Sequence, residues 1–156
     1  MAEKMKIMAA VDLSDYSTAI VRYSARLARK LDGELLLVNV INQRDLDMVQ
    51  RAMVGYQAFS FPNYLKEQVR DRETRLQGLL EAVPTGTQNC RCLVQAGIPY
   101  RELLSVIESE KPNLLVIGTK GRSNLADVVV GSTSRRIYHR SPIPLLTIPA
   151  GFIESP

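Results

Sequence analysis

Glycine and hydroxyl residues are concentrated between Gly118 and Ser134, and their types and spacing suit the binding of a phosphate group. The stretch contains Gly118-Thr119-Lys120-Gly121-Arg122 and then Gly131-Ser132-Thr133-Ser134. Glycines let the backbone approach a ligand closely. A helix that starts at a Gly-Ser-Thr-Ser run presents unpaired N–H groups and hydroxyls, and its dipole favours negative charge. We therefore expect a phosphate cradle here, to which Lys120 and Arg122 can add charge-assisted contacts.

The same glycines could form an ordinary turn, whereas two well-known phosphate-binding loops are excluded. A Gly-x-x-Gly run after a strand also fits an ordinary turn, but the Gly-Ser helix start at a fixed distance favours the phosphate site. No stretch fits the Gly-x-x-x-x-Gly-Lys-Ser/Thr loop, and the dinucleotide fingerprint should follow the first strand, where Asp12-Leu13-Ser14 stands instead. Ser132 can also be an N-cap hydroxyl that binds no ligand.

Asp12 directly follows the first apolar run, where a carboxylate is well placed to contact a ligand. The competing interpretation is that Asp12 caps the first helix, and both roles can coexist. The helix itself is expected to start with Ser14 as its N-cap and Asp15 in its first turn. Its end is expected at Asp32-Gly33, with Gly33 in the left-handed conformation.

The cysteines and the histidine offer little chemistry. Cys90 and Cys92 would lie on one face of a strand, a spacing that fits neither a zinc site nor a thioredoxin-type pair, so we expect ordinary reduced thiols. His139 is the only histidine and is expected in the last turn of a helix, where positive charge suits the dipole. A multi-histidine metal site or a Ser/His triad has no support.

Apolar runs that alternate with helical patterns must position these residues. The last strand contains Pro144, which favours an edge position. The segment 42–63 is the least regular. It is expected to hold a short helix near Met48–Val54, which the run Tyr56–Pro62 ends, and either to pack over the sheet edge or to serve as a partner surface or lid. We expect strands at Lys6–Val11, Glu34–Ile41, Asn89–Gln95, Asn113–Ile117 and Ile143–Ile148. The first helix is expected to follow Ser14, with an apolar pattern from Ala19 to Leu31, and the other main helices are expected at Tyr64–Val83, Pro99–Lys111 and Thr133–Arg140.

This alternation predicts an α/β fold: a parallel open sheet with helices on both faces. A ligand then binds beyond the carboxyl ends of the strands, where the strand order reverses. The loops after the first and fourth strands, which contain Asp12 and the stretch from Gly118, stand out as the binding loops.

Length and composition are those of one globular domain spanning residues 1–156. The chain has 46% hydrophobic and 23% charged residues and a net charge of +4. The charge is mild and mixed in sign, so we expect no nucleic-acid partner, and its local excess near the C-terminus suits an anionic ligand. No apolar run approaches the roughly 18 residues of a membrane span, and no signal peptide is evident, so we expect no membrane partner and a cytoplasmic location.

The glycine spacing resembles the nucleotide-binding signature of the universal stress protein family. Gly118, two residues, Gly121, nine residues and then Gly131-Ser132 reproduce that signature. The resemblance covers the whole chain, in order: Val11-Asp12-Leu13-Ser14, Gly97-Ile98-Pro99, Leu115-Val116-Ile117-Gly118 and Ser141-Pro142-Ile143-Pro144-Leu145-Leu146.

The resemblance implies a single five-stranded sheet of order 3-2-1-4-5, similar to Rossmann folds and to adenine nucleotide alpha hydrolases. It also implies binding of ATP or another adenine nucleotide such as AMP, with Mg or Mn held only through the phosphates near Asp12. Arg122 is a variable position in such proteins and is carried only as a possible contact. The implied site comprises Ala10, Val11, Asp12 and Val40 along adenine and ribose, Ile117, Gly118 and Gly121 on the ribose side, and Gly131, Ser132, Thr133 and Ser134 at the phosphates.

The expected function is that of a regulator or sensor in stress physiology with no catalytic residue and slow ATPase activity at most. Asp12 is the only acid in the expected cleft, and phosphoryl transfer normally needs metal-positioning carboxylates and a water-orienting group. One rival is a slow nucleotide hydrolase, although Leu13–Ser17 shows no Ser-Gly-Gly-x-Asp-Ser loop and no His-x-x-His. The other is a protein-interaction module with structural or no nucleotide. The resemblance also implies a homodimer formed through Ile143–Ile148.

Overall fold

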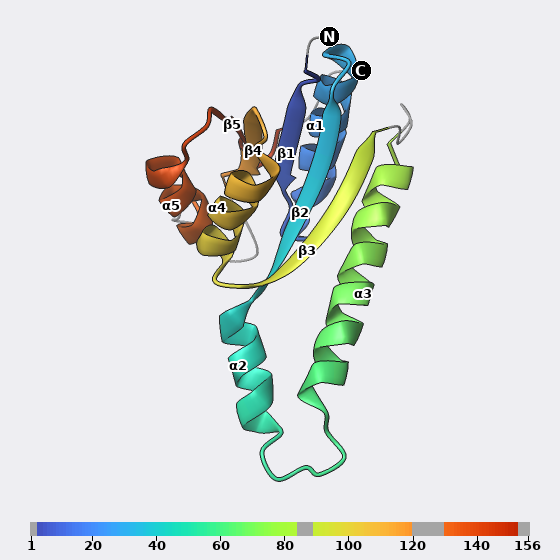
Figure 1. The fold of residues 1–156 in the computed structure, drawn as a ribbon, viewed down its shortest axis with the longest axis vertical. Coiled ribbons are helices and arrows are strands. Elements are labelled where there is room, and N and C mark those ends of the chain that lie inside the picture. The colour runs from blue at the N-terminus through green and yellow to red at the C-terminus, as the bar shows by residue number, and fades with distance from the viewer. Residues whose placement is uncertain (1–2, 84–88, 120–129, 153–156) are drawn as a thin grey trace.

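The fold is a parallel five-stranded sheet with helices on both faces, as the sequence predicts. The computed structural model describes residues 3–83, 89–119 and 130–152. The strand order is β3-β2-β1-β4-β5 and every neighbouring pair is parallel (Figure 1). The order therefore reverses between β1 and β4. The strands are β1 (Lys6–Ala10), β2 (Glu34–Asn42), β3 (Cys90–Gly97), β4 (Leu114–Gly118) and β5 (Leu145–Ile148).

The helices divide between the two faces because successive side chains of each strand point to opposite sides. Ile7 and Ala9 of β1 pack in one core with α1 and α3, whereas Met8 between them packs in the other core with α4 and α5. All three side chains are buried completely. The helices are α1 (Ser17–Lys30), α2 (Gln43–Ala52), α3 (Phe61–Glu81), α4 (Pro99–Glu110) and α5 (Ser132–Arg140).

Helix α1 begins later than expected, and the prediction of Ser14 as its N-cap is wrong. The N-cap is Tyr16, and no side chain caps the helix. Residues 13–16 instead form a turn in which Leu13 adopts a positive φ of 62°. The Asp12 carboxylate supports that turn, so the loop after β1 is shaped by Asp12 rather than by a serine cap.

The end of α1 corrects a second expectation. Asp32, not Gly33, takes the left-handed conformation, with φ of 49°. The N–H of Gly33 donates to Ala28 O at 2.8 Å and the N–H of Asp32 donates to Arg29 O at 3.1 Å, which is a Schellman ending. Gly33 is needed for a different reason: a Cβ at this position would overlap the carbonyl oxygen of Met5.

Segment 42–63 is more regular than expected. Asn42 ends β2 and caps α2, since its side chain accepts a hydrogen bond from Arg44 N at 3.0 Å. The short helix ends at Ala52, before the run 56–62, as expected. Helix α3 starts at Phe61 rather than at Tyr64; Ser60 is its N-cap, and Pro62 lies in its first turn. In Figure 1, α2 and the beginning of α3 extend past the end of the sheet.

The last strand lies at the sheet edge, as Pro144 predicts. It begins at Leu145, so the expected start at Ile143 is two residues early. Among the described residues, no helix is both long enough and apolar enough to cross a membrane.

Candidate functional site

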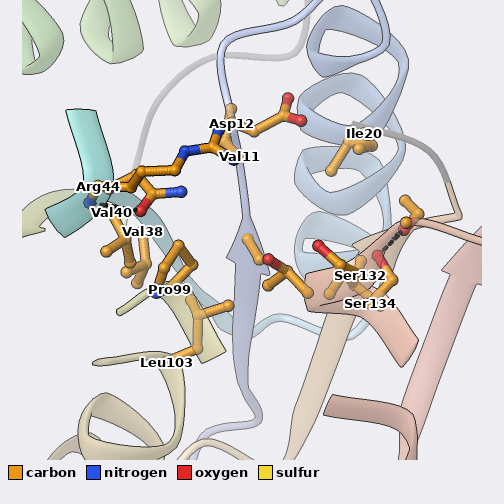
Figure 2. A pocket seen from close by; sticks show the side chains of 16 residues that line it. Val11, Asp12, Ile20, Val38, Val40, Arg44, Pro99, Leu103, Ser132 and Ser134 are labelled. Atoms are coloured by element: carbon orange, nitrogen blue, oxygen red, sulfur yellow. Dashed lines mark hydrogen bonds between the residues drawn. The ribbon is translucent and has the colours of Figure 1, made fainter. Parts of the chain in front are cut away.

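The site lies at the carboxyl ends of β1 and β4, where the strand order reverses. A cavity of about 380 Å³ opens there between the start of α5 and the start of α2 (Figure 2). Ten of the twelve predicted site residues line it. They are Ala10, Val11, Asp12, Val40, Ile117, Gly118, Gly131, Ser132, Thr133 and Ser134. The remaining two, Gly121 and Arg122, lie outside the described residues.

Asp12 is held by the turn that follows β1. Its Oδ1 atom accepts hydrogen bonds from Ser14 N at 2.9 Å and from the Ser17 hydroxyl at 3.3 Å. The expectation that Asp12 caps the first helix is therefore wrong, because the N-cap of α1 is Tyr16 and no side chain caps it; Asp12 instead holds the turn before the helix and the hydroxyl of its first residue. Both of these bonds use Oδ1, so Oδ2 remains for a further donor at the cavity.

A buried amide fixes the end of β1 beside Asp12. Asn39 is 1% exposed. Its amide nitrogen donates to Val11 O at 2.7 Å, and its amide oxygen accepts from Nη1 of Arg72 at 3.1 Å. Val11 N in turn donates to Val38 O at 2.9 Å. Because a buried polar group must find partners, this network fixes the backbone at the cavity floor.

The first turn of α5 forms the polar side of the cavity. Gly131 is the N-cap and contributes no side-chain cap, so the first N–H groups of the helix have no acceptor within it. The alternative interpretation of Ser132 as the N-cap hydroxyl is wrong, because Ser132 is the first helical residue. The N–H of Gly131 donates to Thr119 O at 2.6 Å, and the Ser134 hydroxyl donates to Gly118 O at 2.6 Å. These two bonds tie the helix start to the end of β4.

Apolar side chains form the opposite side of the cavity. In Figure 2, Val38, Val40, Pro99 and Leu103 lie together across β1 from Ser132 and Ser134. In the same view the Arg44 side chain extends from the start of α2 toward Val11 and Asp12. The cavity thus joins an apolar surface to a helix N-terminus, which suits a ligand with a flat apolar part and an anionic part.

Six lining residues were not predicted from the sequence: Ile20, Val38, Asn42, Arg44, Pro99 and Leu103. Two sequence signals pointed to this region. The Gly-x-Pro run indicated a helix start at the end of a strand, which is where Pro99 and Leu103 enter the cavity. Val38 precedes Val40 by two residues on the same face of β2. Asn42 and Arg44 gave no usable signal because segment 42–63 was expected to be irregular.

Metal-binding and reactive groups are sparse in the described part of the chain. Within residues 3–83, 89–119 and 130–152 no three His, Cys, Asp or Glu side chains form a group that could hold a metal ion. Of the described residues that line the cavity, Asp12 is the only acidic one. Cys90 and Cys92 form no disulfide with each other, and burial raises the pKa of both thiols. His139 lies in the last turn of α5, as expected.

Comparison with known proteins gives a consistent match over nearly the whole chain. A model of the universal stress protein family matches residues 4–149. The universal stress protein YxiE of Bacillus subtilis is 25% identical over 150 residues, covering 92% of this chain and 97% of the relative. The universal stress protein Sll1388 of Synechocystis sp. is 24% identical over 148 residues, covering 92% and 96%.

Solved structures are similar in fold. The structure of MJ0577 of Methanocaldococcus jannaschii has a TM-score of 0.70 and 22% identity, covering 94% of this chain and 96% of that chain. A universal stress protein in complex with cAMP has a TM-score of 0.61 and 18% identity, covering 95% and 98%. The Archaeoglobus fulgidus universal stress protein in complex with dAMP has a TM-score of 0.55 and 13% identity, covering 94% and 98%.

Proposed function

Because the chain belongs to the universal stress protein family, we propose that it binds an adenine nucleotide, ATP or AMP, and acts as a regulator or sensor in stress physiology. The observation that carries the proposal is the cavity at the β1/β4 switch point, with an apolar side and a helix N-terminus facing each other. Complexes of similarly folded proteins with cAMP and dAMP support an adenine nucleotide as the ligand.

Each part of the cavity suits one part of the nucleotide. The base would lie against Val40 and Ala10 on the apolar side. Oδ2 of Asp12 would accept a hydrogen bond from a ribose hydroxyl. The phosphates would lie at the N–H groups and hydroxyls of Ser132 and Thr133, where the helix dipole favours negative charge. A volume of about 380 Å³ is within the range of small-molecule sites.

We propose little or no catalysis at this site. Phosphoryl transfer usually needs carboxylates that position a metal and a group that orients the attacking water. Asp12 alone cannot serve both roles, and its Oδ1 is already committed to Ser14 and Ser17. Mg or Mn would therefore be held through the phosphates, with Asp12 nearby.

Binding is tested by two measurements. Mass spectrometry of the denatured, freshly purified protein should reveal a copurified adenine nucleotide. Calorimetry should then show saturable binding of ATP, and Ser132→Ala should weaken ATP binding about tenfold while leaving adenosine unaffected, because a hydrogen bond to a charged group is lost. Ser105→Ala, an exposed serine on α4, is the matched control.

Two results would contradict the binding proposal. The first is that the purified protein retains no nucleotide and shows no saturable ATP binding. The second is that Ser132→Ala and Gly118→Ala both leave the ATP affinity unchanged. Catalysis is tested separately by a sustained turnover assay with a titration of Mg and Mn. Rapid release of ADP or AMP would overturn the non-catalytic proposal and favour the hydrolase.

We also propose that the protein forms a homodimer through its last strand. β5 lies at the sheet edge, and an edge strand offers unpaired backbone groups for pairing with a second copy. Light scattering should give the mass of a dimer at micromolar concentration. A clean monomer there contradicts the proposal, and replacing Thr147 with proline, which removes a strand N–H, should weaken the dimer.

A further inference from the structure

Three arginines surround one tyrosine on the surface of α4 and α5. We call Tyr100, Arg101, Arg136 and Arg140 the arginine cluster. The guanidinium carbons of Arg101, Arg136 and Arg140 lie 5.8, 4.9 and 5.3 Å from the centroid of the Tyr100 ring. Nε of Arg101 also donates a hydrogen bond to the Tyr100 hydroxyl at 3.1 Å. Arg136 and Arg140 are one helical turn apart and so lie on the same side of α5.

No carboxylate within the described ranges pairs with these arginines. Salt bridges among the described residues lie elsewhere, for example between Glu110 and both Lys6 and Arg91, and between Arg44 and Asp45. All three arginines of the cluster are exposed. The cluster is therefore a compact group of positive charges held together by an aromatic ring.

The electrostatics of the cluster favour an anion. Three guanidinium groups near one ring repel one another, and the ring offsets this repulsion only in part. The hydrogen bond from Arg101, with the added charges of Arg140 and Arg136, lowers the pKa of the Tyr100 hydroxyl, a second sign of a positive local potential. An anion that touches several guanidinium groups would relieve the repulsion and gain charge-assisted hydrogen bonds.

We propose that the arginine cluster is a docking surface for a short acidic segment of another protein. The cluster combines residues from only two helices, so its charges are close together and match closely spaced carboxylates. Arginine forks pair with carboxylates through two parallel hydrogen bonds, which gives such a surface selectivity as well as charge.

A nucleic acid fits the cluster less well. Binding of single strands depends on bases that stack on exposed aromatic rings. The guanidinium carbons of three arginines lie 5.8 Å or less from the Tyr100 centroid, and Tyr138, an exposed ring on α5, is in edge contact with His139. Duplex binding requires positive charges spread along a backbone track. Exposed charges of mixed sign elsewhere, such as Arg70 and Asp71 on α3, do not continue the cluster into such a track.

The acidic segment would rest on the same two helices that enclose the cavity. Tyr100 adjoins Pro99 on α4, and Arg136 lies one turn beyond Ser132 on α5, and both Pro99 and Ser132 line the cavity. The proposed docking surface follows only from the charges and geometry of the arginine cluster, so it does not depend on what the cavity binds.

The test measures binding of a fluorescein-labelled oligoglutamate peptide to the full chain by fluorescence anisotropy. The wild-type protein should bind saturably, with an affinity that falls as salt rises. Arg136→Glu/Arg140→Glu should weaken binding by about tenfold or more, because two attractive contacts become repulsive. Arg136→Lys/Arg140→Lys should recover only part of the affinity, because lysine keeps the charge but loses the fork.

The matched control changes the net charge equally at a distant place. Arg22→Glu/Arg29→Glu alters two exposed arginines of α1, on the opposite face of the sheet, and should leave peptide binding nearly unchanged. Circular dichroism verifies that each variant is folded. Equal losses in both double variants, or no saturable binding of the peptide, would overturn the proposal. Binding of a single-stranded oligonucleotide in preference to the peptide would also overturn it, in favour of a nucleic-acid surface.

Discussion

Gly97 occupies a position that both its backbone and its neighbours restrict to glycine. It ends β3 with a φ of +154°, directly before Ile98, the N-cap of α4. A Cβ built on Gly97 would lie 2.5 Å from Oε1 of Glu102 and 2.8 Å from its Cγ and Cδ. The substitution Gly97→Ala therefore introduces two separate penalties, one in the backbone and one against a side chain.

The two penalties have different sizes and different remedies. Placing alanine in a sparsely populated backbone region costs about 1–2 kcal/mol, and nothing at the site relieves it. The overlap involves the far part of a flexible side chain, so rotation of Glu102 limits its cost to about 1 kcal/mol. We expect Gly97→Ala to lower the free energy of unfolding by about 2–3 kcal/mol. The double variant Gly97→Ala/Glu102→Ala should regain only the smaller part.

Urea unfolding followed by circular dichroism measures these differences, with Glu102→Ala completing the double-mutant cycle. Gly78→Ala is the matched control, because Gly78 lies inside α3 and a Cβ there meets no atom within 4 Å. That variant should be more stable than the wild type by up to about 1 kcal/mol. Gly97→Ala should also weaken ATP binding, because a shift at Ile98 moves Pro99 and Leu103, which line the cavity.

Two outcomes would refute this reasoning. If Gly97→Ala is as stable as the wild type, the backbone conformation does not require glycine. If the double variant recovers the full wild-type stability, the whole cost lies in the overlap with Glu102 and the backbone penalty is negligible.

Three further predictions concern other parts of the fold. Gly33→Ala should destabilise the protein by about 2 kcal/mol or more in urea unfolding, because its Cβ would overlap the carbonyl of Met5; a loss well below about 2 kcal/mol would show that the backbone at Met5 can shift. Arg91 donates a hydrogen bond to Glu110 at 2.7 Å and, with Lys6 nearby, holds the Glu110 pKa below its ordinary value of 4.5. The pair therefore stabilises the fold above pH 4.5 and loses this effect as the pH falls through the folded-state pKa. Glu110→Gln should flatten that part of the profile of unfolding free energy against pH, and identical profiles for the variant and the wild type would contradict the pairing. Arg44→Ala should weaken adenosine and ATP binding by the same factor, about two- to fivefold by calorimetry, because Arg44 lines the cavity on the side of β1 opposite Ser132; a larger loss for ATP would place Arg44 at the phosphates.

Short-range patterns in the sequence predicted the strands and the two loops at the cavity, those that contain Asp12 and the stretch from Gly118. Continuous apolar runs such as Leu35–Val38 indicate strands buried on both faces, and residues at strand ends then fall on one sheet edge. The resemblance to a family supplied the strand order, which local patterns do not contain. It also placed Val40, far in sequence from Asp12, at the same site.

The failures came from places where a tertiary contact overrides a local preference. Gly33 was expected to take a left-handed conformation, but the close approach of Met5 demands a residue without Cβ there, and Asp32 takes the positive φ instead. Ser14 was expected to be the N-cap, but Asp12 holds residues 14 and 17 through its carboxylate and delays the helix. The contact of Met5 with Gly33 joins two elements and is not contained in the residues at the helix end. Asp12 was considered as a cap, but the local pattern does not show that its carboxylate binds Ser14 N and the Ser17 hydroxyl in a turn before the helix.

The central position of β1 has a consequence for how the protein folds and responds to a ligand. β1 pairs with β2 nearby in sequence, but its other partner, β4, follows about a hundred residues later: Lys6 and Asn113 exchange backbone and side-chain hydrogen bonds across a separation of 107 residues. Closing so long a loop is entropically costly and slow, so the β1–β4 pairing should form late in folding. The cavity takes Asp12 from one side of this pairing and Ser132 from the other. A ligand that touches both would therefore bind only the fully assembled chain, and its binding free energy would oppose unfolding of the whole molecule rather than of one part.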